Sequence, residues 1–501
     1  MDIISLLENA KDKFAKKEIY EFGDQTLTGE QMYELTLAVA TKIASISAEN
    51  KPIIVISNKN IFIPSIYLGI AYANCFYVPL STEMPKVKVE SVLSLTNAKV
   101  IVYDEGVRDF VLSLNFNGKT ISINECISCE ISREMVESRR NNILDRNPLY
   151  IIFTSGSTGV PKGVVTSHAS VVDYVWTFAE TFNIEEGEIF GNQAPLDYIA
   201  AIRDMYIPLV KGCKSIFIPK TLFSTPKILF GFLNDKKITT ICWVSAALSL
   251  CCTLNVFDEI KPQYLRKVFF TGSVFDYQNL NVWKKNLPSA MFVNHYGPTE
   301  ITASCTYYVV DNAVEYASNL PIGKAFRNRR VFVLNEKNEV AKPFEKGEIC
   351  VAGECLALGY FKNQQKTSEC FVQNPLNDSF EEKIYLTGDV GYADESGTLY
   401  FVGRKDNQIK HMGHRVELDE IENAVQLMPA VNECCCVYNY KKSTITLFYS
   451  GEATPTDISK FLREKLQSFM VPRKFVVLDS LPKLFNGKID RQSLKKQVEL
   501  L

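Results

Sequence analysis

One segment of this chain reads Ile151-Ile-Phe-Thr-Ser-Gly-Ser-Thr-Gly-Val-Pro-Lys-Gly-Val-Val-Thr-Ser-His168 and joins an apolar run to a loop of small polar residues. Small residues let backbone N–H groups approach phosphate oxygens, hydroxyls add donors, and the lysine supplies positive charge. The segment therefore predicts a strand followed by a phosphate-binding loop for a nucleoside triphosphate. Its candidate phosphate contacts are Thr154, Ser155, Gly156, Ser157, Thr158, Gly159 and Lys162.

The spacing of this loop differs from that of the familiar phosphate loop of kinases and GTPases. In that motif Lys-Ser/Thr follows the last glycine directly, whereas here Val160 and Pro161 separate Gly159 from Lys162. A kinase or GTPase therefore loses support. An ordinary flexible surface loop is also disfavoured, because an apolar run flanks the glycines.

Composition bounds the class of protein. The 501 residues are 46% hydrophobic and 22% charged, which is typical of a globular chain of at least two domains. The net charge of −2, with both signs mixed along the chain, does not favour a nucleic-acid or membrane partner. The first twenty residues lack the pattern of a signal peptide, and the longest apolar stretch, near residues 66–80, is too short to span a bilayer. We expect a cytoplasmic enzyme.

Cysteine and histidine usage does not favour a metal or disulfide framework. Fourteen cysteines in a chain this long predict reduced, mostly buried thiols, including a run on a strand at Cys434-Cys-Cys436. Cys126-Ile-Ser-Cys129 has no second pair at zinc-binding spacing, and the four histidines show no ligand spacing. We therefore expect no zinc site.

Short β-branched or aromatic runs alternate with helical patterns through the first 270 residues. This alternation predicts parallel α/β layers. The expected strands are residues 52–57, 76–79, 99–103, 149–153, 212–219, 239–243 and 267–270, with a helix at 226–234. Turns crowd the region 322–400, which predicts a smaller β-rich subdomain.

Four further blocks follow the loop in order. They read Asn294-His-Tyr-Gly-Pro-Thr-Glu300, Tyr385-Leu-Thr-Gly-Asp389 with Gly403-Arg-Lys-Asp406, Ile409-Lys-His-Met-Gly-His-Arg-Val-Glu-Leu-Asp-Glu-Ile-Glu422, and Asn486-Gly-Lys-Ile-Asp490. With the loop they resemble the adenylate-forming superfamily, which includes adenylation domains of nonribosomal peptide synthetases, acyl- and aryl-CoA synthetases, and D-alanine:carrier-protein ligases. The resemblance spans nearly the whole chain.

The resemblance implies a domain organisation. The fold class is α/β, with a large N-terminal adenylation core of α/β layers and a β-rich subdomain over residues 1–403. A hinge at residues 404–406 centres on Asp406. A small mobile α+β C-terminal lid domain then covers residues 407–501, with helices from Glu417 to Val425 and near residues 458–467.

The resemblance also implies the chemistry of the blocks, with ATP and Mg2+ as cofactors. Glu300 is the implied Mg2+ ligand, since a carboxylate is a hard oxygen donor. The implied nucleotide contacts are Thr299 for the α-phosphate, Tyr296 for adenine, and Asp389 with Arg404 for ribose. Domain closure would bring Lys488 against the reacting carboxylate and α-phosphate, where its charge stabilises the transition state.

The second half-reaction uses a thiol. By resemblance, Gly413 lines the entry for a pantetheine thiol, and a glycine permits that close approach. The implied acceptor is the phosphopantetheine of a separate carrier protein. No nucleophilic side chain is needed, because the carboxylate attacks phosphorus and the thiol later attacks the mixed anhydride.

The acid pocket departs from the pattern of amino-acid-activating relatives. In these, an aspartate five residues before an acidic residue binds the α-ammonium group, whereas counting back from Asp204 reaches Ile199. Asp197 would serve only if the strand slipped by two residues, which keeps a side chain on the same face. The implied pocket residues are Asp197, Ile199, Ala200, Arg203, Cys242, Phe269, Thr271, His295, Ala303 and Ser304. Arg203, Thr271 and His295 as polar tips on an apolar wall favour a hydroxybenzoate-like acid over a zwitterion.

Several alternatives stay open from the residues alone. An amino acid, including D-alanine, is one alternative substrate, although Phe270-Thr-Gly-Ser273 replaces the Phe-Cys-Gly-Glu typical of D-alanine ligases. CoA is an alternative thiol acceptor. A nucleotide-binding regulator without catalysis is the alternative outside the enzymes.

Overall fold

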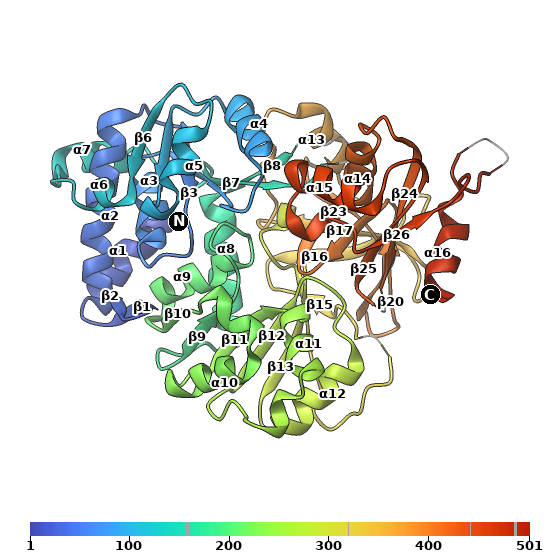
Figure 1. The fold of residues 1–501 in the computed structure, drawn as a ribbon. Coiled ribbons are helices and arrows are strands. Elements are labelled where there is room, and N and C mark those ends of the chain that lie inside the picture. Colours follow the sequence, from blue (N-terminus) through green and yellow to red (C-terminus); the bar gives the residue numbers. More distant parts are fainter. Residues whose placement is uncertain (157–160, 319, 441, 485–487, 501) are drawn as a thin grey trace.

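The computed structural model describes residues 1–156, 161–318, 320–440, 442–484 and 488–500, and its chain forms a large N-terminal domain and a smaller C-terminal domain (Figure 1). Two mixed sheets with helices between them make up most of the N-terminal domain. The mixed α/β fold class predicted from the sequence is confirmed. Within the described part of the chain, no helix combines the length and apolar character needed to cross a bilayer.

The larger sheet has nine strands in the order β15-β14-β13-β12-β11-β9-β10-β1-β2. Its strands are β1 (Glu18–Phe22), β2 (Gln25–Thr28), β9 (Ile189–Asn192), β10 (Lys214–Phe217), β11 (Thr240–Val244), β12 (Lys267–Thr271), β13 (Met291–Tyr296), β14 (Thr306–Val309) and β15 (Lys324–Ala325). The six strands from β13 to β1 run parallel. Alternation places Trp243 and Phe270 on one face and Cys242 and Phe269 on the other.

The second sheet has seven strands in the order β18-β8-β7-β4-β3-β5-β6. Its strands are β3 (Pro52–Ile56), β4 (Phe76–Leu80), β5 (Val100–Tyr103), β6 (Lys119–Ser122), β7 (Pro148–Thr154), β8 (Lys162–Ser167) and β18 (Gly359–Tyr360). β8 returns antiparallel to β7, so the predicted phosphate loop joins these two strands. Ser167 then caps the next helix by accepting a hydrogen bond from the Ser170 backbone N–H.

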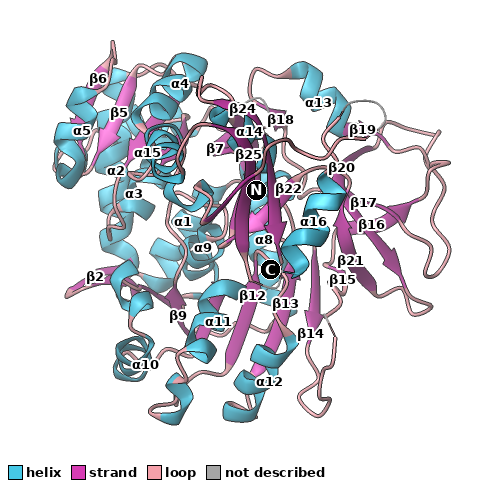
Figure 2. Ribbon diagram, turned by 45° about the vertical axis from the view of Figure 1, so that its right-hand side comes forward, coloured by secondary structure: helices cyan, strands magenta, loops and turns pink. Residues whose placement is uncertain are grey.

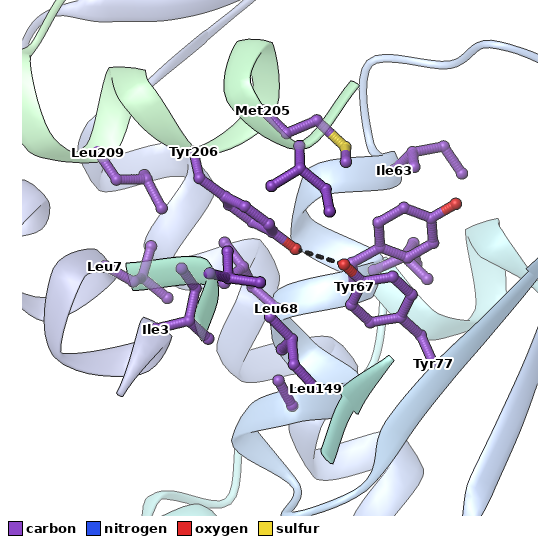
Figure 3. Close-up of a cluster of buried hydrophobic side chains, with 14 of the residues drawn as sticks. Ile3, Leu7, Ile63, Tyr67, Leu68, Tyr77, Leu149, Met205, Tyr206 and Leu209 are labelled. Atoms are coloured by element: carbon purple, nitrogen blue, oxygen red, sulfur yellow. Dashed lines mark hydrogen bonds between the residues drawn. The ribbon is translucent and has the colours of Figure 1, made fainter. Parts of the chain in front are cut away.

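Helices of the N-terminal domain lie between and outside the two sheets. They are α1 (Ile3–Phe14), α2 (Gly29–Ile46), α3 (Ile63–Tyr72), α4 (Lys86–Thr96), α5 (Arg108–Ser113), α6 (Ile123–Ile127), α7 (Arg133–Arg140), α8 (His168–Thr181), α9 (Ala201–Lys211), α10 (Pro226–Asp235), α11 (Ser245–Thr253), α12 (Tyr277–Asn286) and α13 (Gln364–Cys370). One buried core joins α1, α2, α3, α8 and α9 to side chains from both sheets. Figure 3 shows part of it, where the Tyr206 hydroxyl of α9 lies 2.9 Å from the Tyr77 hydroxyl of β4.

The β-rich subdomain predicted over residues 322–400 is an antiparallel sheet of five strands. Its strands are β16 (Arg329–Leu334), β17 (Gly347–Gly353), β19 (Phe371–Gln373), β20 (Lys383–Ala393) and β21 (Leu399–Arg404). The pairing of β20 with β21 sets Asp389 opposite Arg404. Two predicted nucleotide-binding residues are thus neighbours on adjacent strands.

The C-terminal domain contains a two-stranded hairpin and a three-stranded sheet with helices (Figure 2). Its elements are β22 (Gln408–His411), β23 (His414–Glu417), α14 (Leu418–Val425), β24 (Val431–Asn439), β25 (Thr444–Gly451), α15 (Pro455–Lys465), β26 (Lys474–Val477) and α16 (Arg491–Leu500). Both predicted helices are present, and Cys434 to Cys436 lie buried in β24 as predicted. The fourteen cysteines of the chain are free thiols.

Candidate active site

A cavity lies where the N-terminal domain meets the β22–β23 hairpin of the C-terminal domain. We call it the site cavity. Its lining residues are Tyr198, Ile199, Ala200, Arg203, Val244, Thr271, Gly272, Gly297, Pro298, Thr299, Ala303, Ser304, Asp389, Arg404, Gln408, Lys410, Gly413 and Arg415. The lining joins residues from three of the sequence blocks with six residues of the predicted acid pocket, so the structure brings these parts of the predicted site together.

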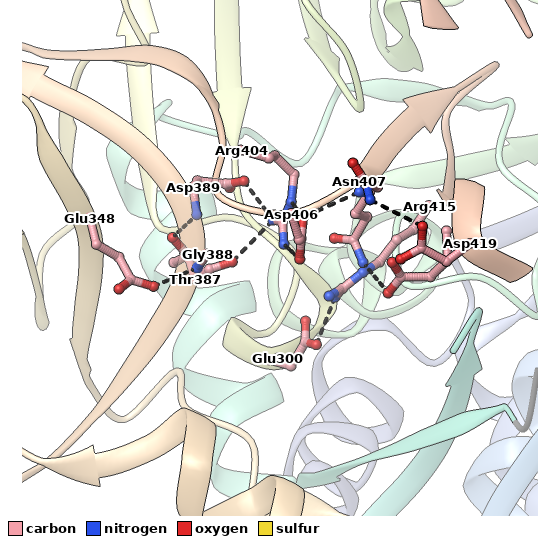
Figure 4. A network of polar contacts seen from close by, with 12 residues as sticks. Glu300, Glu348, Thr387, Gly388, Asp389, Arg404, Asp406, Asn407, Arg415 and Asp419 are labelled. Atoms are coloured by element: carbon pink, nitrogen blue, oxygen red, sulfur yellow. Dashed lines mark hydrogen bonds and ion pairs between the residues drawn. The ribbon is translucent and has the colours of Figure 1, made fainter. Parts of the chain in front are cut away.

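An ion-pair network occupies the end of the cavity that carries Asp389 (Figure 4). Asp389 Oδ1 accepts a hydrogen bond from Arg404 Nη1 at 2.6 Å, and its other oxygen accepts from the Tyr296 hydroxyl. Arg404 also makes a bidentate pair with Asp406, at 2.6 and 2.7 Å. Two carboxylates therefore fix the guanidinium of Arg404, and the predicted ribose contacts are preorganised.

Glu300 is fully buried and its two carboxylate oxygens differ. Oε1 accepts hydrogen bonds from Arg415 Nη1 and from the Tyr360 hydroxyl, both at 2.7 Å. Oε2 is buried and has no hydrogen-bond partner within the described ranges of the chain. Burial favours the neutral acid, but the Arg415 guanidinium and the Tyr360 hydroxyl together hold the pKa of Glu300 below its usual value. Glu300 is therefore an ionised carboxylate whose Oε2 atom makes no hydrogen bond to the described residues.

Lys162 begins β8, paired with Thr154 at the end of β7, so the two ends of the predicted phosphate loop are held together. Its Nζ lies 3.4 Å from Glu417 Oε1, and both side chains are largely buried. Ser155 Oγ donates to the Arg415 carbonyl oxygen at 2.8 Å. Gly156 is described, whereas three predicted phosphate contacts, Ser157, Thr158 and Gly159, lie outside the described residues.

Gly413 forms the turn between β22 and β23 and reaches the N-terminal domain. Its φ is +85°, and a Cβ there would lie 2.6 Å from Val244 Cγ1. Its carbonyl oxygen accepts a hydrogen bond from the Tyr198 hydroxyl at 3.0 Å. Only a glycine meets both demands without strain, so the turn's position in the site cavity depends on this residue.

The predicted acid pocket forms the other end of the cavity. Ile199, Ala200, Thr271, Ala303 and Ser304 line it together with Arg203, while Cys242 and Phe269 are buried at 2% and 0% exposure and do not reach the lining. His295 is also buried outside the lining, with its ring 5.4 Å from that of Phe269. Burial first, and then the charge of Arg203, lowers the pKa of His295 well below its usual value, so the imidazole is neutral.

Two expectations about this pocket need correction. Asp197 was considered as an alternative ammonium ligand through a slip along a strand, but it lies in the turn-rich segment between β9 and α9, and it does not line the cavity. Burial raises its pKa to about 6. His295 was expected as a polar tip, but both ring nitrogens are buried and face no hydrogen-bond partner in the described part of the structure. A turn has no two-residue side-chain alternation, which removes the basis for the slip.

Arg203 is 1% exposed and lies on the first turn of α9. Nη1 donates to the Tyr174 hydroxyl at 3.0 Å, and the guanidinium carbon lies 5.2 Å from the ring centroid of Phe178. The nearest carboxylate oxygen, on Asp204, is 3.5 Å from Nε. A buried cation with one loose ion pair therefore borders the acid pocket.

Lys162 and Glu300 do not line the cavity but contact β23 of the hairpin that does, whereas Lys488 belongs to a different segment. Its side chain is exposed, in the segment between β26 and α16 where Lys483 pairs with Ile489. It is not among the described residues that line the site cavity. In this arrangement the hairpin with Gly413, and not Lys488, lines the cavity beside the predicted nucleotide-binding residues Thr299, Asp389 and Arg404.

Sequence reasoning missed several residues that contact the site. Arg415 and Glu417 lie in a block that was recognised, yet only Gly413 was singled out there. Their alternation on β23, with opposite charges two residues apart, was the available signal, since such residues share one face of a strand. Lys410 lines the cavity with its Nζ 5.5 Å from the ring centroid of Tyr296, and burial lowers its pKa. Tyr360 comes from β18, and no local pattern predicts its contact with Glu300.

The cavity thus brings predicted nucleotide contacts, the predicted acid pocket and a glycine turn together, as expected of an enzyme that activates acids with ATP. The chain belongs to the AMP-binding enzyme family, whose model matches residues 7–361, while the model of the AMP-binding enzyme C-terminal domain matches residues 420–488. It is therefore an adenylate-forming enzyme, an AMP-forming acid–thiol ligase.

Relatives and solved structures resemble the chain over its whole length. A D-alanine--D-alanyl carrier protein ligase of Bacillus cereus is 28% identical over 99% of this chain and 100% of its own, and one of Bacillus mycoides is 29% identical over the same shares. The adenylation domain AlmE of Vibrio cholerae matches with a TM-score of 0.84 at 20% identity, covering 100% of this chain and 97% of its own. The o-succinylbenzoate CoA synthetase of Bacillus subtilis matches with a TM-score of 0.84 at 19% identity, covering 98% of each. These structures confirm the fold.

Proposed function

We propose that this enzyme joins a carboxylic acid to ATP as acyl-AMP, releases pyrophosphate, and then transfers the acyl group to the phosphopantetheine thiol of a separate carrier protein. One observation carries the proposal. Three of the nucleotide residues, Thr299, Asp389 and Arg404, border one cavity together with the acid pocket and the Gly413 turn. The relatives named carrier-protein ligases match over their full length, which supports a carrier thiol as the acceptor of the acyl group.

In the first half-reaction the chain's residues hold the nucleotide and the acid. Asp389 accepts from the ribose hydroxyls with Arg404 fixed beside it, Tyr296 packs along adenine, and Thr299 donates to the α-phosphate. Lys162 and the loop that it follows bind the outer phosphates, and the carboxylate of the substrate attacks the α-phosphorus.

Magnesium fits this site because Glu300 Oε2 is buried, ionised and without a hydrogen-bond partner in the described ranges. Bound there, Mg2+ would neutralise charge on the transferring phosphates. Glu300 is the residue that we assign to hold it.

We place the boundary between the domains at residues 404–406, with residues 1–403 as the core and 407–501 as the lid. Asp406 is the hinge residue. Rotation there would exchange the hairpin for Lys488, which would then stabilise the charge that develops at the α-phosphate.

The acid that we propose lacks an α-ammonium group. Asp389 is the one carboxylate among the described lining residues, and Arg404 and Tyr296 already engage it. An ammonium beside Ile199 would be desolvated without a partner. Arg203 and Thr271 instead offer donors to an oxygen at the far end of the acid, as a hydroxybenzoate would present.

The test is acid-dependent exchange of pyrophosphate into ATP across hydroxybenzoates, benzoate, D-alanine, L-amino acids and β-amino acids. Exchange with hydroxybenzoates, exceeding that with benzoate, is the expected outcome, and Arg203→Met should remove that preference. Exchange with D-alanine or another amino acid would show that the substrate is an amino acid and not an aryl acid. ATP binding with no exchange for any acid would favour a nucleotide-binding regulator.

The thiol acceptor is tested separately. The enzyme, loaded with an acid that supports exchange, is offered holo carrier protein or CoA in parallel. Thioester on the carrier protein alone is the expected result, and turnover with CoA alone would show an acyl-CoA ligase instead.

A further inference from the structure

We propose that Lys59 is a positioning residue for the acid pocket, and that Asn192 and Asp204 connect its ammonium group to the guanidinium of Arg203. Lys59 lies in the segment between β3 and α3, outside the sequence blocks of the site, and the proposed half-reactions do not use it. Because the connection ends at Arg203, this inference rests on the role that the proposed function gives to Arg203.

The ammonium group of Lys59 holds the carboxyl ends of two neighbouring strands of the nine-stranded sheet. Its Nζ donates to Asn192 Oδ1 at 2.8 Å and lies 3.3 Å from the Asn192 carbonyl oxygen, at the end of β9. It also lies 3.1 Å from the carbonyl oxygen of Ile218, directly after β10, and 3.2 Å from that of Gln193. Since Lys59 follows β3 of the seven-stranded sheet, one side chain joins the two sheets where the acid-pocket segment begins.

Asn192 connects this contact to the acid pocket. Its Oδ1 accepts from Lys59, and its Nδ2 donates to Asp204 Oδ2 at 2.8 Å. Asp204 Oδ1 lies 3.5 Å from Nε of Arg203, which lines the site cavity. We call Lys59, Asn192, Asp204 and Arg203 the polar series. Its last three members are buried, so a hydrogen bond lost among them is not replaced by one to water.

The charges of the polar series make its members depend on one another. Asp204 is the carboxylate between two cations, Lys59 and Arg203. Burial raises the pKa of Asp204, and the charge of Arg203 and the hydrogen bond from Asn192 oppose that rise. Burial likewise lowers the pKa of Lys59 to about 7, and the charges of Asp204 and Asp197 oppose that fall. Loss of the Lys59 charge therefore leaves Asp204 held less firmly beside Arg203.

Two other contacts hold Arg203 without the polar series. Nη1 donates to the Tyr174 hydroxyl at 3.0 Å, and Nη2 donates to the Ala200 carbonyl oxygen at 3.3 Å. Nε has no hydrogen-bond partner in the described ranges, and Asp204 lies on that side of the guanidinium. These contacts keep Arg203 in the pocket when the polar series is broken, but its direction is then less fixed. Substitution of Lys59 should therefore weaken recognition of the acid and not abolish adenylation.

The test compares acid-dependent pyrophosphate exchange for a hydroxybenzoate and for benzoate, which differ by one hydroxyl group, at saturating MgATP. Lys59→Met should lower the preference for the hydroxybenzoate in kcat/KM by about tenfold, through a higher KM for that acid, because a contact to the bound acid is weakened. kcat and the KM for MgATP should stay near their wild-type values. An unchanged preference in Lys59→Met would overturn the inference.

A second variant and a matched control separate this role from general stability. Asn192→Leu removes both hydrogen bonds of the amide at similar volume and should lose the same preference, so it decides the test if Lys59→Met does not fold. Lys267 likewise donates to two backbone carbonyl oxygens after α8, both at 2.9 Å, and pairs with Glu188, but it begins β12 at the opposite end of the sheet. Lys267→Met should keep the preference. An equal loss of preference in Lys267→Met would overturn the inference.

A double-mutant cycle shows whether Lys59 acts through Arg203. In the Arg203→Met background, Lys59→Met should cause no further loss of preference, because the residue that it positions is absent. Equal effects of Lys59→Met in both backgrounds would overturn the inference and leave the proposed role of Arg203 intact. A preference that survives in Arg203→Met itself would refute that role, and the inference with it.

Amide hydrogen exchange measures the connection without any acid. In the full-length enzyme, Lys59→Met and Asn192→Leu should each raise the exchange rate of amides in residues 192–206 by about tenfold, whereas Lys267→Met should leave that segment unchanged. Unchanged amide exchange in both variants would overturn the inference. Faster amide exchange, with no pyrophosphate exchange for any acid, would refute the proposed function and still support the connection from Lys59 to Arg203.

Discussion

The two segments of the C-terminal domain that carry predicted site residues differ sharply in their surroundings. The hairpin with Gly413 and Arg415 is packed into the site cavity, whereas Lys488 is exposed and lies in a segment away from the lining. Both segments are proposed to serve the same nucleotide and acid. Under the proposed function, the orientation seen here would serve thiol transfer, and adenylation would require another.

The largest expected effect comes from removing Lys488, the predicted catalytic residue of the exposed segment. Lys488→Ala should lower acid-dependent pyrophosphate exchange about a thousandfold, because a cation is lost from the charge developing at phosphorus. Transfer from premade acyl-AMP to the thiol should persist, since Lys488 is outside the cavity in the orientation seen here.

Lys495→Ala, at an exposed lysine of α16, is the matched control and should leave both half-reactions intact. Equal loss of both half-reactions in Lys488→Ala would contradict the division of labour. Unchanged exchange would refute the catalytic role of Lys488 outright.

A smaller effect is expected at the hairpin turn, where a substitution should slow thiol transfer and not adenylation. Gly413→Ala would place a Cβ 2.6 Å from Val244 Cγ1 and force an L residue to φ +85°. Transfer from premade acyl-AMP should fall by about tenfold to a hundredfold, the range expected for about 1–3 kcal/mol of strain and overlap, while pyrophosphate exchange is retained. Stopped-flow or quenched-flow measurement of each half-reaction separates the two.

Gly397→Ala distinguishes overlap from backbone strain. Gly397 has φ +79°, and a Cβ there would meet nothing within 4 Å. Gly397→Ala should therefore carry a similar backbone strain but keep the wild-type rate of acyl transfer from acyl-AMP. A transfer rate in Gly413→Ala equal to that in Gly397→Ala would show that the contact with Val244 does not position the turn.

The smallest effect concerns pH and His414 on β23. Burial lowers its pKa to about 4, with Glu83 raising it and Lys220 and His411 lowering it further. Its ring stacks on Phe469 at 4.0 Å and lies 5.7 Å from Tyr198. If withdrawal of the hairpin restores the ordinary value near 6.5, the withdrawn state binds more protons between about pH 4 and 6.5. Acidification through that window therefore favours withdrawal.

Transfer rates in the wild type should consequently fall a few-fold as the pH is lowered from 7 to 5, beyond any change in pyrophosphate exchange. His414→Phe keeps the stacking surface and removes the titration, so its transfer rate should show a weaker dependence over the same range. Parallel pH profiles of the two proteins would contradict this role for His414.

The sequence predicted the local parts of this enzyme well. Buried strands such as β3 and β12 read as short β-branched or aromatic runs, and alternation alone determines which of their residues face which layer. Asp389 and Arg404 were each assigned to the ribose because each belongs to a recognisable block, and strand pairing places the two side by side. Such features depend on neighbours along the chain or on spacing that many chains share.

What the sequence did not predict depends on contacts between distant segments. The pairs of Arg415 with Glu300 and of Glu417 with Lys162 join residues 115 and 255 positions apart. Asp197 was proposed from the alternation of side chains along a strand, whereas its segment is a turn without that alternation. His295 was misjudged because the aromatic residues that bury it come from α8, β12 and the segment before β16.

The hydrogen bond between Tyr206 and Tyr77 bears on attempts to change the acid that this enzyme accepts. Helix α9 carries Arg203 and directly follows Ile199 and Ala200 of the acid pocket, and through Tyr206 the same helix is joined to the seven-stranded sheet within the main core. Redesigning specificity on this helix would therefore disturb the part of the protein that holds its layers together. Thr271, at the cavity surface on β12, is a position where a new side chain would leave that hydrogen bond in place, whereas Ala303 has φ +72°, where a bulky side chain is strained.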